Sequence, residues 1–306
     1  MSIVHLDTGG AVAESETALR ERAAETLERA YGFLESQPDP WARLRAQVLC
    51  GARRASELTD RIAGTQFPDG SLPLGSLVSG GGLGFPPTDL DSLDANGVAI
   101  VGTLEGLLMA ADAKLIHADW VESAARALEA RQSEDGAFRL QPAAPGQPAQ
   151  QADIFWTGMV AGILGRTPVS RPSLLEAAGE FLAEQFEPDL VENGGYAPLL
   201  AYSLFFTNVA HELADEALQW CGRALEKGFR SRQIDAVATL RVLLTCDAQA
   251  LPGATFEIGE LLTRLLEEQA GDGGFAELST AGAAARTTQT FDAMLAIVRL
   301  CAALGD

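Results

Sequence analysis

The pattern of apolar and polar positions divides the chain into helices of two kinds. Helices of the first kind carry apolar residues on one face, at the spacing of three and four residues that Leu19, Ala23 and Leu27 illustrate. Helices of the second kind are apolar nearly all round, which is typical of a helix buried on every side. One-faced helices are predicted at 14–36, 41–62, 119–131, 173–185, 214–227 and 256–269, all-round apolar ones at 92–111, 153–164, 198–213 and 287–300, and a mixed one at 232–245.

The alternation of the two kinds predicts the fold. An inner ring of buried helices inside an outer ring of amphipathic ones produces it, and counting pairs gives about six, the first being 14–36 with 41–62. No stretch shows the pattern of a β-strand. We therefore expect an all-α protein with a flexible N-terminus at 1–14. A single (α/α)6 toroid is predicted at 15–306, closed by its last inner helix against the first.

A short phrase, Gln-x-x-Asp-Gly-x-(Leu/Phe), recurs along the chain. It occupies 66–72, 132–138 and 269–275, and a looser copy with displaced glycines runs from 185 to 196. Such self-similarity indicates a repeat architecture. Five helices share a second signature, in which a bulky apolar residue precedes Asp or Thr and a small residue. We expect the Asp or Thr to cap each helix N-terminus. The five triplets are Leu93-Asp94-Ala95, Trp156-Thr157-Gly158, Phe206-Thr207-Asn208, Ile234-Asp235-Ala236 and Phe291-Asp292-Ala293.

The repeated phrase, followed by a loop and an apolar helix, resembles the prenyltransferase and squalene-oxidase repeat. This repeat builds terpenoid cyclases such as squalene–hopene cyclase, class II diterpene cyclases and the β subunit of protein prenyltransferases. The resemblance covers about 66–300. It implies an (α/α)6 toroid whose cavity opens near the N-termini of the inner helices. Class II cyclases of this family normally carry two helical barrels, whereas this chain has room for one.

Two carboxylates stand where the resemblance places the chemistry. The stretch Thr88-Asp89-Leu90-Asp91-Ser92 resembles the DxDD motif with which class II terpene cyclases protonate an alkene or epoxide. Two crowded carboxylates in an apolar surrounding raise the pKa of one of them, which keeps its proton available at neutral pH. On this register Asp91 is the catalytic proton donor and Asp89 its partner, and Ser92 replaces the family's final Asp. The alternative is that Asp91 and Asp94 merely cap the inner helix, and that Asp89 and Asp91 are otherwise ordinary loop residues.

The predicted substrate-binding residues lie on or beside the inner helices. Aromatic rings around a cavity would suit a polyene and stabilise carbocations by cation–π attraction, whereas the alternative is ordinary core packing. Asp153 stands at the loop-to-helix junction of the next unit, and Arg286, before the last inner helix, is a candidate for binding a diphosphate. The aromatic residues are Phe155, Trp156, Tyr202, Phe205, Phe206 and Phe291.

The sequence holds no cofactor motif. Its three histidines form no metal-ligand cluster, and its four cysteines lie far apart as expected of buried free thiols. Phe155 stands where the prenyltransferase β subunit has the Cys of its zinc-binding Asp-x-Cys, so a zinc-dependent prenyltransferase is rejected. There is no Asp-rich DDxxD motif. We expect no cofactor, with Mg²⁺ needed only for a diphosphate substrate and zinc not expected.

The charge balance limits the partners. Lys and Arg number 22 against 42 Asp and Glu, giving a net charge of −20. Nucleic acids and anionic membranes need clustered positive charge. The N-terminus lacks the pattern of a signal peptide, and no apolar run approaches ~18 residues. We expect a cytoplasmic protein without a nucleic-acid partner or transmembrane segment. Its partner is a small hydrophobic substrate, and a homo-oligomer or partner subunit is compatible with the sequence.

These observations lead to one expected function and its rivals. We expect a terpenoid-cyclase-like enzyme that holds an isoprenoid or polyene in the toroid and starts cyclisation by protonation from Asp91. One rival is a non-catalytic toroid that binds a hydrophobic ligand or serves as a partner subunit in a biosynthetic complex. Another is a non-terpene cyclase that uses the same cavity. A carbohydrate-active toroid fits less well, since its sites usually need well-separated carboxylates.

Overall fold

The computed structural model describes residues 8–73, 92–141, 150–275 and 283–304, with side chains from residue 16 onward. Within these ranges the protein is all-α, as predicted, and holds no β-strand beyond one isolated bridge between Gln269 and Phe275. The helices are α1 (Thr8–Ser36), α2 (Pro40–Leu49), α3 (Ala55–Ala63), α5 (Ala95–Asp112), α6 (Asp119–Glu129), α7 (Gln151–Gly165), α8 (Pro172–Glu184), α9 (Pro188–Asn193), α10 (Tyr196–Asn208), α11 (Ala214–Arg230), α12 (Ala236–Cys246), α13 (Ile258–Glu267) and α14 (Ala283–Ala303).

The two kinds of helix differ in burial as the sequence pattern indicates. The helices α5, α7, α10 and α12 are buried along nearly their whole length, whereas α6, α8, α11 and α13 bury one face only. The buried helices contact one another in the order α5, α7, α10, α12 and α14, and α12 also contacts α5. Burying a helix on all sides removes its apolar surface from water, which is the main force that holds this core together.

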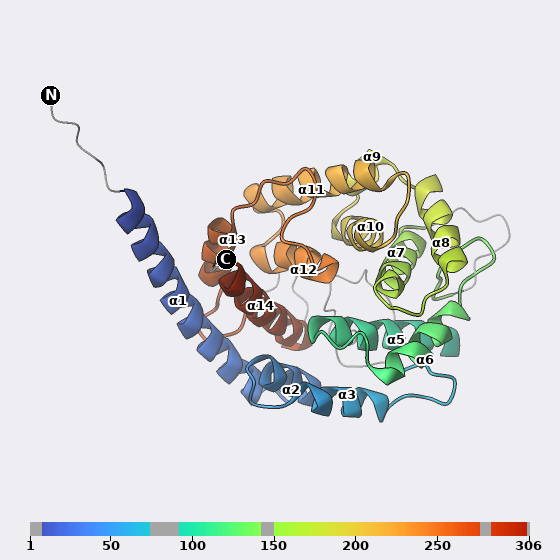
Figure 1. Ribbon diagram of the computed structural model, residues 1–306, viewed down its shortest axis with the longest axis horizontal. Coiled ribbons are helices and arrows are strands. Elements are labelled where there is room, and N and C mark those ends of the chain that lie inside the picture. Colours follow the sequence, from blue (N-terminus) through green and yellow to red (C-terminus); the bar gives the residue numbers. More distant parts are fainter. Residues whose placement is uncertain (1–7, 74–91, 142–149, 276–282, 305–306) are drawn as a thin grey trace.

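The end of the chain returns to its beginning. Helix α14 packs against both α1 and α2, and α13 also lies against α1 (Figure 1). A hydrogen bond from Gln269 Nε2 to the Thr26 carbonyl, 2.9 Å long, and another from Arg29 Nη2 to the Ala270 carbonyl, also 2.9 Å, join the two ends. Residues more than two hundred positions apart therefore share one interface.

Several element boundaries differ from the sequence predictions. The predicted helix at 41–62 is two helices, α2 and α3. Gly51, with a left-handed φ of 73°, separates them, and Arg54 is the N-cap of α3. Helix α1 begins at Thr8, before the predicted start at 14, and α14 begins at Ala283, before the predicted start at 287. Short polar residues inside these stretches therefore did not stop the helices.

The predicted capping signature holds for two of its five members. Asp94 caps α5, accepting from Gly97 N at 2.8 Å, and Asp235 caps α12, accepting from Ala238 N at 2.7 Å. The prediction is wrong for Thr157 and Asp292, which lie in the interiors of α7 and α14, and for Thr207, near the end of α10. These three helices begin before the triplets. The unpaired N–H groups of their first turns therefore lie nearer the N-terminus than the predicted capping residues do.

Candidate functional site

The three full copies of the repeated phrase fold into the same turn. In each copy the Gln side chain donates a hydrogen bond to the carbonyl of the Gly four residues later, which closes the turn. The Asp side chain accepts from the backbone N–H two residues later. The Gln–Gly distances are 2.7 Å from Gln66 to Gly70, 2.9 Å from Gln132 to Gly136 and 2.9 Å from Gln269 to Gly273, and the Asp acceptors are Asp69, Asp135 and Asp272.

The turn requires glycine for two reasons. Its φ is 89° at Gly70, 87° at Gly136 and 90° at Gly273, a conformation that side chains rarely adopt. A Cβ would also lie 2.1–2.5 Å from a backbone carbonyl oxygen of a neighbouring outer helix. The Asp-Gly pair of the phrase therefore encodes a close approach between a turn and a helix.

Each turn also ties two neighbouring helices together. The same Gln amide donates to the backbone of an adjacent outer helix, and the apolar residue at the end of the phrase donates its N–H to a buried threonine on an inner helix. The carbonyls belong to Trp120 (3.1 Å), Leu174 (2.9 Å) and Thr26 (2.9 Å). The N–H···Oγ1 pairs are Leu72 with Thr103 (2.9 Å), Phe138 with Thr157 (2.9 Å) and Phe275 with Thr290 (3.0 Å).

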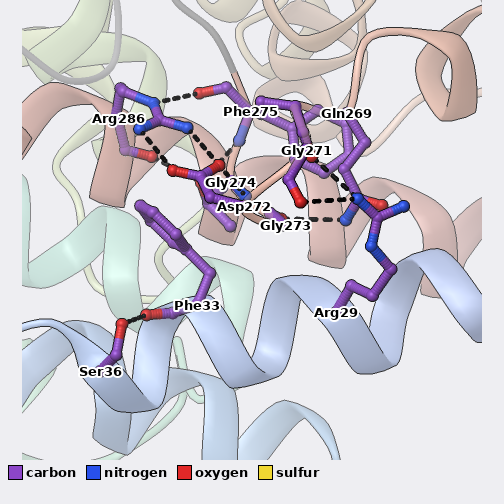
Figure 2. A network of polar contacts seen from close by, with 12 residues as sticks. Arg29, Phe33, Ser36, Gln269, Gly271, Asp272, Gly273, Gly274, Phe275 and Arg286 are labelled. Carbon is purple, nitrogen blue, oxygen red and sulfur yellow. Dashed lines mark hydrogen bonds and ion pairs between the residues drawn. The ribbon is translucent and has the colours of Figure 1, made fainter.

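The third turn joins the end of the chain to α1. Figure 2 shows Arg29 of α1 reaching the backbone of the turn at Gly271, and Arg286 reaching Asp272 from the first part of α14. The Arg286 guanidinium makes two bonds to the Asp272 carboxylate, of 3.0 Å and 2.8 Å, and lies 5.0 Å from the centre of the Phe33 ring. The interface between the two ends of the chain is thus built from the repeated phrase itself.

Replacing Thr157 by Val is expected to lower the free energy of unfolding by about 1–3 kcal/mol. Valine keeps the shape of threonine but leaves the buried Phe138 N–H without its acceptor. Urea denaturation of the purified variant measures the change. The exposed Thr207 provides a matched control, and Thr207→Val should shift stability by no more than about 0.5 kcal/mol. Equal stability of Thr157→Val and wild type would contradict the assigned role.

The looser fourth copy forms a different structure. Helix α9 (Pro188–Asn193) interrupts it, and Gly195, with a φ of 91°, precedes α10 directly. Pro188 fixes the backbone for the start of α9. The three full copies contain no helix. The looser copy therefore keeps its predicted place between a one-faced helix, α8, and a buried one, α10, but does not form the turn of the three full copies.

The predicted catalytic pair, Asp89 and Asp91, lies outside the described residues. Helix α5, which follows the pair in the sequence, is described from its N-cap onward. Asp94 holds the N-cap position of α5, so the capping role belongs to the residue three positions after Asp91. The structure therefore confirms the predicted capping role of Asp94.

The structure gives Asp153 and Arg286 partners within the chain. Asp153 lies in the first turn of α7, accepts from the Gln150 N–H at 3.1 Å and lies 3.4 Å from Arg139 Nε. Arg286 pairs with Asp272, as described above. Both side chains thus stabilise the junctions that precede α7 and α14. Their predicted substrate contacts remain predictions.

The six predicted aromatic residues are all buried, with exposed fractions of 3% or less. Tyr202 stacks on Phe206 at 6.0 Å between ring centres, and Phe205 meets Phe206 edge to face at 5.1 Å, all on α10. Phe155 and Trp156 on α7 meet edge to face at 5.1 Å. The structure thus groups five of the six on two helices that contact each other.

Phe291 lies apart from that group and faces a charge. The guanidinium of Arg45 sits 3.7 Å from the centre of its ring, so the ring already stabilises a cation by the attraction that was predicted for a substrate. A hollow of about 30 Å³ adjoins this pair, lined among others by Asp112 and Met109.

Arg45 belongs to a buried ion cluster that joins α2, α5, α12 and α14. Asp112 accepts from Arg45 Nη2 at 2.8 Å and from Arg241 Nη1 at 3.1 Å, and Arg241 Nη1 also contacts Asp292 at 3.2 Å. None of the four side chains is more than 7% exposed. Burial raises the pKa of Asp292 to about 6 against the opposing effect of Arg241. The cluster connects early and late segments of the chain through charge.

The aspartates of the repeated turns are poor proton donors. Hydrogen bonds from Ser71 and Arg131 lower the pKa of Asp69 to about 2, Arg139 lowers the pKa of Asp135, and Arg286 lowers the pKa of Asp272. A carboxyl that loses its proton so readily is ionised at neutral pH and serves as an acceptor. These three residues therefore hold the turns in place.

A carboxylate pair that the sequence analysis did not single out lies at the start of α12. Asp235 caps the helix, and both oxygens of Glu268 accept from Ala236 N, at 2.9 Å and 3.0 Å. Burial raises the pKa of both carboxyl groups. Glu268 directly precedes the third repeat of the phrase, but its partner lies 32 residues away, so no local pattern could indicate the contact.

Among the described residues, no group of three or more His, Cys, Asp and Glu side chains is arranged to hold a metal ion. A search of the described helices for one long and apolar enough to cross a membrane also found none. Comparison with known proteins found neither a matching family model nor a matching curated protein.

Proposed function

We propose that the chain is an (α/α)6 toroid that cyclises an isoprenoid or polyene, with Asp91 as the proton donor and Asp89 as its partner. The pairing of one-faced with buried helices, and the contact between the two ends of the chain, support the toroid. So does the use of one turn geometry in three places. The small hydrophobic substrate, the cytoplasmic location and assembly with a second copy or a partner subunit remain parts of this proposal.

The chemistry needs a carboxyl that gives its proton to carbon. As the carboxyl O–H bond breaks, a C–H bond forms at one end of an alkene and leaves a carbocation on the neighbouring carbon. The next alkene attacks that carbocation and closes a ring, and loss of a proton elsewhere completes an isomerisation. This sequence requires no metal, and Mg²⁺ would serve only to bind a diphosphate group on the substrate.

The observation that carries the proposal is the capping of α5 by Asp94. In the sequence, Asp89 and Asp91 stand directly before this helix, which is buried along most of its length. Two neighbouring carboxylates repel each other, and this repulsion raises the pKa of one of them. A carboxyl group with a raised pKa keeps its proton at neutral pH and can donate it. The turn aspartates, in contrast, are held ionised by arginine partners.

Asp91→Asn is expected to reduce turnover at least a hundredfold, because asparagine cannot donate the initiating proton. Farnesyl diphosphate, geranylgeranyl diphosphate and squalene serve as trial substrates, with products detected by mass spectrometry. Asp94→Asn is the matched control, since asparagine caps helices as well as aspartate does and should leave turnover and stability unchanged. Equal turnover of Asp91→Asn and wild type would remove Asp91 from the mechanism.

A second candidate function is a toroid that binds a hydrophobic ligand without converting it. The mutual burial of the predicted aromatic residues favours this reading, since their faces are occupied by one another. If the chain only binds its ligand, the trial substrates bind to the wild-type protein and are recovered without chemical change. Formation of any cyclised product by wild type, at a rate that Asp91→Asn reduces, would favour the enzyme.

A further inference from the structure

A pocket of about 400 Å³ lies at the C-terminal end of α5, where Lys114 forms part of its wall. Helix α5 has 18 residues, which corresponds to about 27 Å along its axis. The volume falls within the range of small-molecule sites. The pocket lies between the C-terminal parts of α12 and α14, the start of α13 and the residues that follow α5 and α12. Its wall includes Lys114, Leu243, Leu244, Arg299, Leu300 and Ala302.

The wall of the pocket is mainly apolar. Leu243 and Ala296 are buried beneath it, while Leu244, Ile258 and Leu300 are half-buried and contribute apolar surface to the hollow. Water in contact with such a surface is unfavourable, and an apolar chain that displaces it gains free energy. The wall therefore favours a hydrophobic group.

Two cations border this apolar wall. Lys114 is exposed and forms no ion pair with the residues that the structure describes. Arg299 Nη1 lies 3.9 Å from Asp247 Oδ1, and that carboxylate is 61% exposed. The lining of the hollow thus holds two cations and one carboxylate, Asp247, which leaves it a net positive charge. An anionic group is the complement of that charge.

The last carbonyls of α12 do not need the two cations as caps. Cations do stabilise unsatisfied C-terminal carbonyls. However, the Thr245 carbonyl already accepts from Arg166 Nη1 at 2.9 Å, and backbone N–H groups of Ala248 and Asp247 satisfy the two residues before it. Lys114 and Arg299 therefore retain donors that the end of α12 does not use.

The backbone at the rim is strained. Lys114 has a φ of 59° and Asp247 a φ of 53°, and they are two of the three described non-glycine residues in the left-handed region. Glycine or asparagine usually occupies this position after a helix. Strained residues cluster at ligand sites, where the side chain matters more than the backbone cost.

We propose that this pocket binds an amphiphile with one apolar chain and an anionic head group. The chain lies along Leu243, Leu244 and Leu300, and the carboxylate or phosphate head contacts Lys114 and Arg299. The site is separate from the proposed catalytic end, so the proposal stands whether or not the chain is a cyclase.

Calorimetric titration with dodecanoate, dodecyl phosphate and dodecanol tests the proposal. Wild type should bind the two anions at least tenfold more tightly than dodecanol. A double variant that combines Lys114→Gln with Arg299→Gln should lose that preference. It should bind dodecanoate, dodecyl phosphate and dodecanol with equal affinity. Ala302→Trp, at an exposed position of the wall, should weaken binding of all three at least tenfold. Arg126→Gln, on the exposed face of α6, is the control for lost charge and should bind as wild type does.

The outcomes separate the proposal from its rivals. Tighter binding of dodecanoate than of dodecyl phosphate identifies a carboxylate head, and the reverse order a phosphate head. Equal affinity of wild type for dodecanol and the anions would overturn the proposal. So would an anion preference that survives in the double variant, or wild-type affinity in a natively folded Ala302→Trp. Circular dichroism of each variant verifies the fold, which the two glutamine substitutions on the rim leave intact.

Discussion

Asp112→Asn is expected to lower the free energy of unfolding by about 3–5 kcal/mol, the usual cost of removing one partner from a buried ion pair. Asp112 accepts from Arg45 at 2.8 Å and from Arg241 at 3.1 Å, and both guanidinium groups are almost completely buried. Asparagine retains the shape but not the charge. Two buried cations would then share the more distant carboxylates, chiefly Asp292.

The origin of this loss can be separated from a change in side-chain packing. The midpoint of urea denaturation is compared for Asp112→Asn, for Asp112→Asn combined with Arg45→Met, and for Glu122→Gln. The added methionine removes one unpaired cation and should recover part of the loss. Glu122 forms an exposed ion pair with Arg126, so its variant should change stability by no more than about 1 kcal/mol. A double variant less stable than Asp112→Asn would contradict the charge argument.

Gly136→Ala is expected to destabilise the protein by about 4 kcal/mol. A φ of 87° costs a side chain about 1–3 kcal/mol, and forcing atoms into an occupied space costs about 1–3 kcal/mol more. The new Cβ would lie 2.1 Å from the Ala177 carbonyl oxygen, which belongs to the backbone of α8 and cannot move alone. Thermal and urea denaturation measure the effect.

Gly195→Ala separates the two contributions. Gly195 has nearly the same φ, 91°, but a Cβ there would meet no atom within 4 Å. Its variant should therefore show the backbone cost alone, about 1–3 kcal/mol. If Gly136→Ala and Gly195→Ala lost equal stability, the close approach of the turn to α8 would have no energetic role.

The helices were predictable because burial follows periodicity. A one-faced pattern predicted α6, α8 and α11, and an all-round apolar pattern predicted α5 and α7, within a few residues. The repeated phrase was also visible. Its geometry was not, because the threonine partner follows the turn by 31, 19 or 15 residues in the three copies. Insertions of variable length between two contacting residues erase any fixed spacing.

The ion cluster was beyond a local pattern. Asp112 is separated from Arg45 by 67 positions and from Arg241 by 129. A single charge inside an apolar helix, such as Arg241 in α12, is nevertheless a signal, since burying an unpaired charge is costly and demands a partner. The same reasoning would have removed Asp292 from the predicted caps. The sequence indicates which residues need partners, and only the fold shows which partners they find.

The candidate site was predictable in part. Asp94 as a cap followed from the preference of aspartate for helix starts, and the structure confirms it. The burial of the aromatic residues also followed from their place in apolar helices. What those rings contact depends on how α7 and α10 pack together, which no periodicity encodes.

Incubation of the trial polyenes in deuterium oxide tests the central claim, protonation by Asp91, most directly. The carboxyl proton exchanges with solvent, so the cyclised product should carry one deuterium on carbon and weigh one mass unit more than the product formed in water. Asp91→Asn should give no labelled product, while Asp94→Asn should give as much as wild type. A cyclised product that carries no deuterium would show that the reaction starts without protonation of carbon, which contradicts the proposed mechanism.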